Sequence, residues 1–292
     1  MDAPPPLIPP VLSDPVSSSN SLVQNSTSPA RPRWCWVIHL AVIAAFLIGI
    51  GARSSRGADS PSGPALPEDI PGLLKAAGLA LGEFGIFLGI AWAFSRANAK
   101  DLLLRWRFGI TAWPLSFAYS VGLRITVAII LGPILLAWTM LSSSKIKDGR
   151  ELMPKIENLI STDALRNPWY MFLTVTLVSF VVAGLREELW RSAFIAGVRR
   201  LAPKSWSTRR AEIVGVILGA ILFGLGHLSQ GWQAVLPTGI LGLCLGLIMV
   251  FHQSIWPAVL AHGFFDATTF AILPWALPYV TEKLKTLAPF LG

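Results

Sequence analysis

Long apolar runs separated by short charged segments dominate the chain between residues 34 and 273. A helix needs roughly 20 apolar residues to cross a hydrocarbon core of about 30 Å. The runs extend over residues 34–51, 73–94, 112–141, 170–185, 213–227, 235–251 and 255–273. We therefore predict an all-α fold, a polytopic transmembrane helical bundle with seven or eight spans.

The number of spans depends on the run 112–141, which is longer than one crossing requires. A helix of this length tilts strongly, or it breaks near Pro133, because proline removes a helical hydrogen bond. The other segments are simpler. We expect a disordered tail over residues 1–33, since this segment is rich in Pro, Ser and Asn without hydrophobic periodicity, and it does not have the pattern of a signal peptide. Transmembrane helices follow over 34–168, and residues 276–292 form a C-terminal tail.

Composition and charge agree with a membrane protein. Hydrophobic residues make up 53% of the chain and charged residues only 14%. The net charge of +8 does not indicate nucleic-acid binding, because the basic residues occupy connections between apolar runs rather than one soluble face. Excess Lys and Arg mark cytoplasmic loops. We expect a multi-pass protein of the bacterial inner (cell) membrane with a cytoplasmic N-terminus and two cytoplasmic loops, which contain Arg96, Lys100, Arg105 and Arg107, and Arg199, Arg200, Lys204, Arg209 and Arg210.

Three groups of charged or ionisable residues interrupt the apolar pattern in the C-terminal half. A charge at membrane depth costs about 2.5–3.5 kcal/mol, so it needs a partner, a water-filled cavity or a function. The first group is Arg186-Glu187-Glu188-Leu189-Trp190-Arg191, which we interpret as a charged helix end. Glu187 and Arg191 are four residues apart and can form an ion pair. By itself, this group is equally typical of an interfacial charge cluster.

The other two groups contain histidine. Phe223-Gly224-Leu225-Gly226-His227 ends one run, and its glycines allow close approach of another helix or a substrate backbone. Ala261-His262-Gly263-Phe264-Phe265-Asp266 lies inside the last run. His262 and Asp266 share a helix face, and a buried Asp needs a partner. His39 and His252 have no acid at helical spacing, so we assign them to packing or to the membrane interface.

Together the three groups supply a carboxylate base, two imidazoles and a second acid. A Glu can deprotonate water while a His orients it, and a second His with an Asp can stabilise the oxyanion formed at an amide carbonyl. The expected reaction is peptide hydrolysis. Zinc is possible, because two His and a carboxylate can bind it with an open position, but no cofactor is required by the sequence. Cys35 and Cys244 lie in predicted spans and indicate neither a disulfide nor a metal site.

The order Glu-Glu with Arg, then Phe-x-x-x-His, then His-x-x-x-Asp resembles the CAAX prenyl protease type 2 and bacteriocin-processing family of intramembrane proteases, also called CPBP or Abi. Gly242-Leu243-Cys244-Leu245-Gly246, Ser254-Ile255-Trp256-Pro257-Ala258 and Ala261-His262-Gly263 strengthen the resemblance. It implies a catalytic core over residues 169–275. It also implies a peptide or lipidated-protein substrate, such as a CAAX-type prenylated tail, and membrane lipids as surroundings.

The resemblance implies a role for each residue. Glu187 or Glu188 would be the general base, His227 would position the water, His262 and Asp266 would stabilise the oxyanion, and Arg191 would anchor the glutamates. Asp266 stands where many members have Asn. The family has three residues between the glutamate pair and the Arg, whereas this chain has two. Aligning Arg191 places Arg186 at the first glutamate and implies an altered enzyme, while aligning the glutamates requires a local distortion of the helix. Ser192 also replaces the usual Gly.

Three functional hypotheses follow. The first is an intramembrane endopeptidase, which all three groups support. The second is a catalytically impaired member that acts as an immunity or scaffold protein, which the irregular Glu–Arg spacing and Arg186 favour. The third is a transporter, which the concentration of polar groups in one half makes the weakest.

Overall fold

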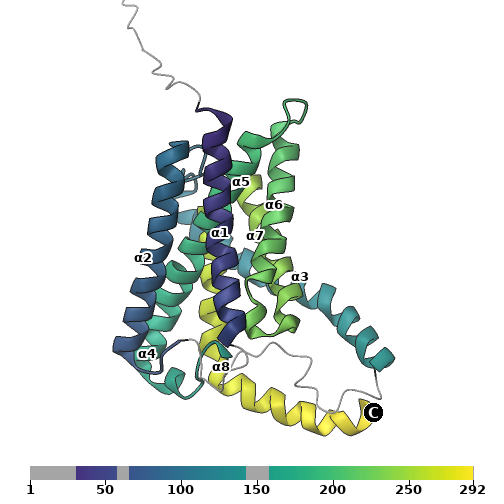
Figure 1. The fold of residues 1–292 in the computed structure, drawn as a ribbon. Helices are drawn as coiled ribbons and strands as arrows, with labels where there is room; N and C mark the ends of the chain where they lie inside the picture. Colours follow the sequence, from purple (N-terminus) through teal and green to yellow (C-terminus); the bar gives the residue numbers. More distant parts are fainter. Residues whose placement is uncertain (1–30, 58–65, 143–157, 292) are drawn as a thin grey trace, which may run out of the picture. The chain divides into compact units, whose positions relative to one another are not determined.

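The computed structural model describes residues 31–57, 66–142 and 158–291, and the regular structure within these ranges is helical (Figure 1). This confirms the predicted all-α class. The predicted N-terminal tail lies outside the described residues except at its end, where α1 begins at Arg33. The helices are α1 (Arg33–Gly57), α2 (Ile70–Ser95), α3 (Ala112–Ser142), α4 (Pro168–Leu173), a π-helical segment (Thr174–Leu185), α5 (Arg186–Leu201), α6 (Thr208–Leu225), α7 (Trp232–His252) and α8 (Trp256–Leu291).

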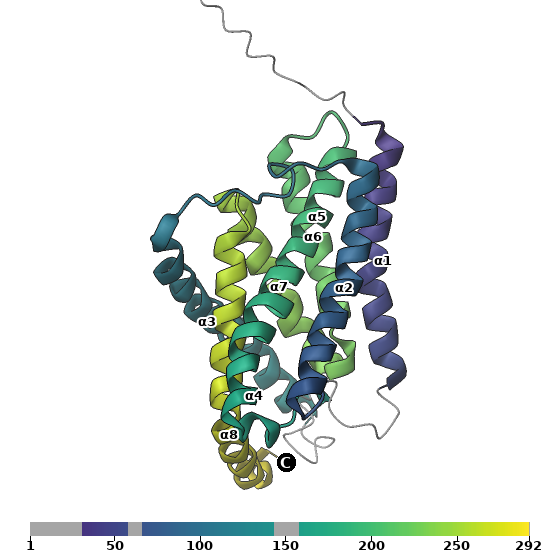
Figure 2. The same ribbon diagram turned by 90° about the vertical axis from the view of Figure 1, so that its left-hand side faces the viewer.

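Because α4, the π-helical segment and α5 form one continuous helix over Pro168–Leu201, the described residues make seven helical passes, which run in alternating directions in Figures 1 and 2. Four segments are long and apolar enough to cross a membrane by length and composition: Ile70–Ser95, Gly109–Ile134, Pro168–Leu201 and Trp232–His252. The remaining passes are shorter in apolar length or contain charge. The apolar part of α1 is only Arg33–Gly49, α6 begins with a charged turn, and α8 contains His262 and Asp266.

The structure decides between the two alternatives for the run 112–141, and it extends the last helix. Helix α3 continues through Pro133 without a break, so the long run is one pass. Helix α8 continues to Leu291, past the point where we expected the core to end at residue 275. Local sequence explains where several passes begin. Asp69 accepts a hydrogen bond from the Gly72 amide (2.7 Å) at the start of α2, and Asn167 caps α4 in the same way, each next to a proline in the first turn.

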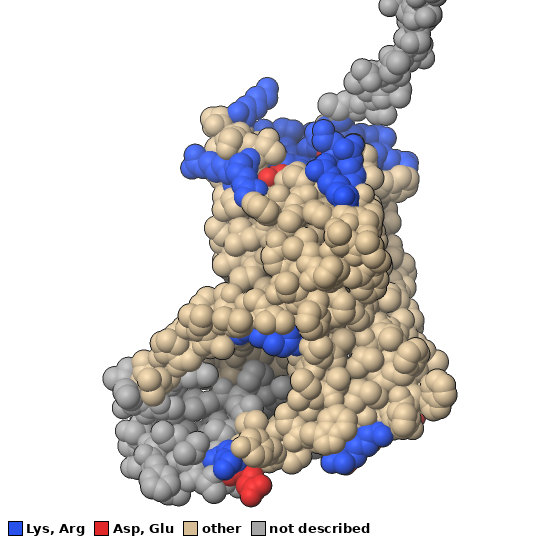
Figure 3. All heavy atoms as spheres, turned by 180° about the vertical axis from the view of Figure 1, so that it is seen from behind, with Lys and Arg blue, Asp and Glu red and all other residues tan. Residues whose placement is uncertain are grey.

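The basic residues gather at one end of the helices, the upper end in Figure 3. Arg33, at the start of α1, donates to the carbonyl oxygen of Leu201 at the end of α5 (2.6 Å). The connection from α2 to α3 meets the same end, since Leu103 and Arg105 accept hydrogen bonds from Ile255 and Ser254, which precede α8. The two predicted basic loops therefore lie together, on the same side as residue 33.

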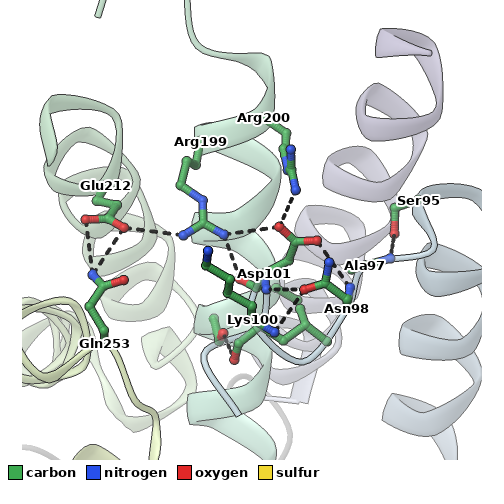
Figure 4. A network of polar contacts seen from close by, with 12 residues as sticks. Ser95, Ala97, Asn98, Lys100, Asp101, Arg199, Arg200, Glu212 and Gln253 are labelled. Atoms are coloured by element: carbon green, nitrogen blue, oxygen red, sulfur yellow. Dashed lines mark hydrogen bonds and ion pairs between the residues drawn. The ribbon is translucent and has the colours of Figure 1, made fainter. Parts of the chain in front are cut away.

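A buried network fastens these loops (Figure 4). Asp101, which is 6% exposed, pairs with Arg200 (2.5 Å) and Arg199 (3.4 Å), and Arg199 also pairs with Glu212 of α6 (3.3 Å). Gln253, in a left-handed conformation after α7, donates to Glu212 (3.3 Å). A buried carboxylate is tolerated when it is paired in this way. The network ties the α2–α3 and α7–α8 connections to α5 and α6.

We predict that Asp101→Ala lowers the free energy of unfolding by about 1–3 kcal/mol, because the change removes the buried carboxylate that Arg199 and Arg200 share and leaves Arg199 with Glu212 alone. Thermal unfolding in detergent measures the effect. Asp163→Ala is the control, since its ion pair with Arg166 is solvent-exposed and should contribute little. Equal effects of the two substitutions would contradict the structural role of the network.

We also predict that residues 100 and 204 lie on one side of the membrane and residue 163 on the other. Leu66 and Tyr170 bond to Leu159 and Pro67 at the end away from the basic loops, which places Asp163 there. Single cysteines introduced as Lys100→Cys, Lys204→Cys or Asp163→Cys in a Cys35→Ser, Cys244→Ala background would be labelled with a membrane-impermeant maleimide. The same labelling pattern for Asp163→Cys and Lys100→Cys would refute the topology.

Candidate active site

A close contact between the π-helical segment and α8 brings the acidic and histidine groups together. A methyl group at Gly184 would lie 2.8 Å from the carbonyl oxygen of Val259, and the ring of Phe180 fills the space beside Gly263. Only glycine allows two helices to approach this closely. As a result, the first turn of α5, with Glu187 and Glu188, faces the His262 turn of α8.

Glu188 lies at the centre of the site and is fully buried. One of its carboxylate oxygens forms an ion pair with Arg191, which is also fully buried. The other lies 3.0 Å from Nδ1 of His262. Both oxygens of Glu188 are thus engaged, and water has no access to the side chain. Glu188 holds the imidazole of His262 in place and neutralises Arg191.

Arg191 occupies a compartment built from α6 and α7. Its guanidinium lies 4.5 Å from the ring centre of Phe223, an arrangement typical of a cation–π contact. A methyl group at Gly242 would lie 2.9 Å from Phe223 and 3.4 Å from an Arg191 nitrogen, and one at Gly246 would lie 2.9 Å from Val216 and 3.4 Å from Cδ of Arg191. The two glycines of the Gly-Leu-x-Leu-Gly run therefore leave room for the arginine.

Glu187 has different surroundings. It pairs with Arg186 (2.8 Å), and its other oxygen lies 3.9 Å from Nε2 of His262. Its side chain is 18% exposed, whereas that of Glu188 is 0% exposed. Our prediction that Glu187 pairs with Arg191 was wrong. Positions three residues apart also share a helix face, and Glu188 uses this spacing, so that Glu187 remains open to the site.

This pairing bears on the irregular spacing of the motif. Arg191 follows Glu188 by three residues and forms an ion pair with it. The spacing that is one residue shorter than in the family therefore still allows the arginine to contact a glutamate. The π-helical segment, in which hydrogen bonds span five residues, ends at Leu185, directly before Arg186. Our interpretation of Arg186–Arg191 as a helix end was also wrong, because the helix continues to Leu201.

His262 and Asp266 meet as the four-residue spacing predicts. Nε2 of His262 lies 3.6 Å from the Asp266 carboxylate, and the Asp266 side chain is 22% exposed. With Glu188 at Nδ1, both ring nitrogens of His262 face carboxylates, an arrangement that suits a ring donating from both sides. The face of the site that is open to a ligand consists of Glu187, Asp266 and Nε2 of His262.

His227 follows α6 and packs on Phe223, with ring centres 4.6 Å apart. Its Nδ1 lies 2.8 Å from the Phe223 carbonyl oxygen. Because that oxygen only accepts, Nδ1 is the donor, and Nε2 of the neutral ring is left to accept a hydrogen bond. Glu187 and His262 are among its electrostatic neighbours. Gly224 allows the close helix approach that we predicted, since a methyl group there would lie 2.6 Å from the Val235 carbonyl oxygen of α7.

The remaining histidines lie outside this group. His39 is buried, and its ring nitrogens face the carbonyl oxygens of Ala91 and Ala193. His252 bonds to the hydroxyl of Tyr119 (2.8 Å) at the end of α7. Both serve packing, as expected. Ser192, which follows Arg191, is buried and donates to the Leu102 carbonyl oxygen, so this departure from the family pattern fastens α5 to the α2–α3 connection.

Sequence reasoning missed Arg124 of α3. Its guanidinium donates to the carbonyl oxygen of Phe265 (2.6 Å), the neighbour of Asp266 on α8. The signal was present, since Arg124 is a lone charge inside a predicted span, and intramembrane charges mark functional positions by default.

The donor atoms do not form a ready metal site. Among the described residues, no group of three or more His, Cys, Asp or Glu side chains is placed to bind a metal ion. The oxygens of Glu188 face Arg191 and His262, and one oxygen of Glu187 faces Arg186. Cationic partners at both glutamates work against a divalent cation. We therefore derive no step through zinc.

The geometry suits hydrolysis by an activated water molecule. The partly exposed carboxylate of Glu187 lies beside Nε2 of His262, and His227 is an electrostatic neighbour of both residues. A carboxylate, a donor nitrogen and an accepting imidazole are the groups that such a reaction needs. No residue of the group is a nucleophilic serine or cysteine.

Comparison with protein-family models identifies a relationship for the part of the chain that contains the site. Residues 168–268 match the family model described as "Type II CAAX prenyl endopeptidase Rce1-like". The matched segment includes all six residues that we selected from the sequence. No curated protein and no solved structure matches the chain.

The two glutamates should differ in their effect on stability. We predict that Glu188→Gln lowers the free energy of unfolding by about 3–5 kcal/mol, because it leaves Arg191 buried without a counter-charge. Glu187→Gln should change it by much less, since the Glu187 side chain is partly exposed. Denaturant or thermal unfolding in detergent compares them, and a greater loss in Glu187→Gln would show that the assignment is reversed.

Proposed function

We propose that this chain, which over residues 168–268 belongs to the CAAX prenyl protease family, is a glutamate-type intramembrane endopeptidase. The observation that carries the proposal is the contrast between its two glutamates. Glu188 is enclosed by Arg191 and His262, whereas Glu187 is open to the site beside Nε2 of His262. A general base must reach water, so we assign that role to Glu187.

The reaction uses Glu187, His227 and His262 in turn. Water attacks the carbonyl carbon of the scissile peptide bond while Glu187 takes its proton, and Nε2 of His227 accepts a hydrogen bond that orients the water. The carbonyl oxygen becomes an oxyanion and receives a hydrogen bond from Nε2 of His262, which Glu188 holds at Nδ1. Glu187 then returns the proton to the amide nitrogen, the C–N bond breaks, and a carboxylic acid and an amine are released.

The other residues set the positions of these groups. Asp266 faces the same nitrogen of His262 (3.6 Å) and supports the oxyanion-stabilising pair. Arg191 neutralises Glu188, and Arg186 holds one oxygen of Glu187 so that the other faces the site. Neither arginine needs to contact substrate.

The substrate class follows from the family and the position of the site. A peptide or a lipidated protein tail, for example of the CAAX type, would enter from the membrane to reach Glu187. We place both basic loops and the N-terminus in the cytoplasm, by the excess of Lys and Arg at that end, and the protein in the bacterial cell membrane.

One observation favours a second candidate, a catalytically impaired member that acts as an immunity or scaffold protein. Arg186 pairs with Glu187 at 2.8 Å, so a guanidinium already occupies one oxygen of the carboxylate that would have to act as the base. In this case the biological effect would persist when Glu187 is replaced.

Cleavage of a quenched fluorescent prenyl-peptide panel by purified protein tests the proposal. We predict cleavage by the wild type that persists with a chelator, and a loss of about 10²–10⁴-fold in kcat for Glu187→Gln, the range that general acid–base groups contribute. Asp163→Asn, far from the site, is the control. Glu187→Gln with wild-type activity would overturn the assignment, and loss of cleavage with the chelator would favour a metal enzyme.

A further inference from the structure

Arg124 is the single charged residue of α3, and it points to α8 rather than to lipid. Its guanidinium donates to the Phe265 carbonyl oxygen (2.6 Å), to the Thr268 hydroxyl and to the Thr269 hydroxyl (3.2 Å). It also lies 4.3 Å from the ring centre of Phe265. Four contacts therefore converge on one turn of α8.

That turn contains Asp266. The charges of Arg124 and Asp266 act on each other, although the pair is not in direct ion-pair contact. Asp266 in turn faces Nε2 of His262. A substitution of Arg124 would thus alter the position and the electrostatic environment of the Asp266 carboxylate, and through it the imidazole of His262.

The pairing of acids with cations in the site also points to a role for Arg124 beside Asp266. Glu187 has Arg186 and Glu188 has Arg191 as cationic partners. Asp266 is the third acid of the site, and Arg124 is the cation that acts on it across the α3–α8 interface. The Asp266 side chain is only 22% exposed, and without the charge of Arg124 its carboxylate would draw more strongly on the proton of His262.

We infer that Arg124 is a positioning residue, which neutralises Asp266 and fixes the α8 turn so that Nε2 of His262 remains available to the oxyanion. This inference rests on the proposed function. A residue that merely joined α3 to α8 would act independently of the charge of Asp266. The positioning role that we infer for Arg124 depends on that charge.

The first experiment requires no activity. The chain has four histidines, so ¹³C,¹⁵N-histidine NMR in detergent gives four ring signals, and His262→Gln identifies that of His262. We expect Arg124→Gln to move the His262 signal and to leave that of His39 in place. In the Asp266→Asn background, Arg124→Gln should have little further effect. An unmoved His262 signal, or equal shifts in both backgrounds, would overturn the inference.

The second experiment measures cleavage. Arg124→Gln should lower kcat by up to about 100-fold, the loss that misplacement of a group by about 1 Å can cause, with little change in KM, and Arg124→Lys should recover part of it. Thr268→Val is the matched control, because it removes one acceptor of Arg124 and leaves the charges unchanged. It should retain most of the activity.

The outcomes separate the two proposals. A wild-type protein that cleaves no peptide of the panel would overturn the proposed function and, with it, the catalytic role of Arg124. An active wild type with an unchanged kcat in Arg124→Gln would overturn the inference alone. A loss in Thr268→Val equal to that in Arg124→Gln would show that Arg124 only joins the helices.

Discussion

The buried ion pair between Glu188 and Arg191 is the interaction on which the rest of the site depends. Two fully buried charges persist in an apolar bundle because each neutralises the other, while Glu188 also meets His262 and Arg191 lies over the ring of Phe223. The pair determines which glutamate is enclosed, and it orients His262 through the second oxygen of Glu188. Gly242 and Gly246 of α7 leave space beside its arginine, next to Phe223 and Val216 of α6. Glu187 is left as the carboxylate that can do chemistry.

Charged side chains are paired in the same way elsewhere in the described part of the bundle. At the basic end, Asp101 and Glu212 are paired with Arg199 and Arg200, and in the site each glutamate has its own arginine. Close packing through Gly184 and Gly263 then brings these paired groups within reach of one another. The chain combines a low content of charge with a strict pairing of the charges that it buries.

Periodicity and motif order predicted much of this arrangement. The apolar runs located the passes, because hydrocarbon thickness sets their length, and the order of Glu, His and Asp identified the residues that meet. The sequence could not decide between Glu187 and Glu188 as the partner of Arg191, since positions three and four apart on a helix both permit a pair. It also gave no signal for the π-helical segment, and the contact of Arg124 with α8 depends on tertiary packing that spacing along one helix does not encode.

Chemical rescue can show which of the two glutamates is the general base. In Glu187→Ala a small carboxylate such as formate can enter the open space left by the missing side chain, whereas the space left in Glu188→Ala is enclosed by Arg191, His262 and their neighbours. The account predicts that added formate restores peptide cleavage to Glu187→Ala in a concentration-dependent manner and leaves Glu188→Ala inactive. Rescue of Glu188→Ala without rescue of Glu187→Ala would contradict it, because the enclosed glutamate would then be the base.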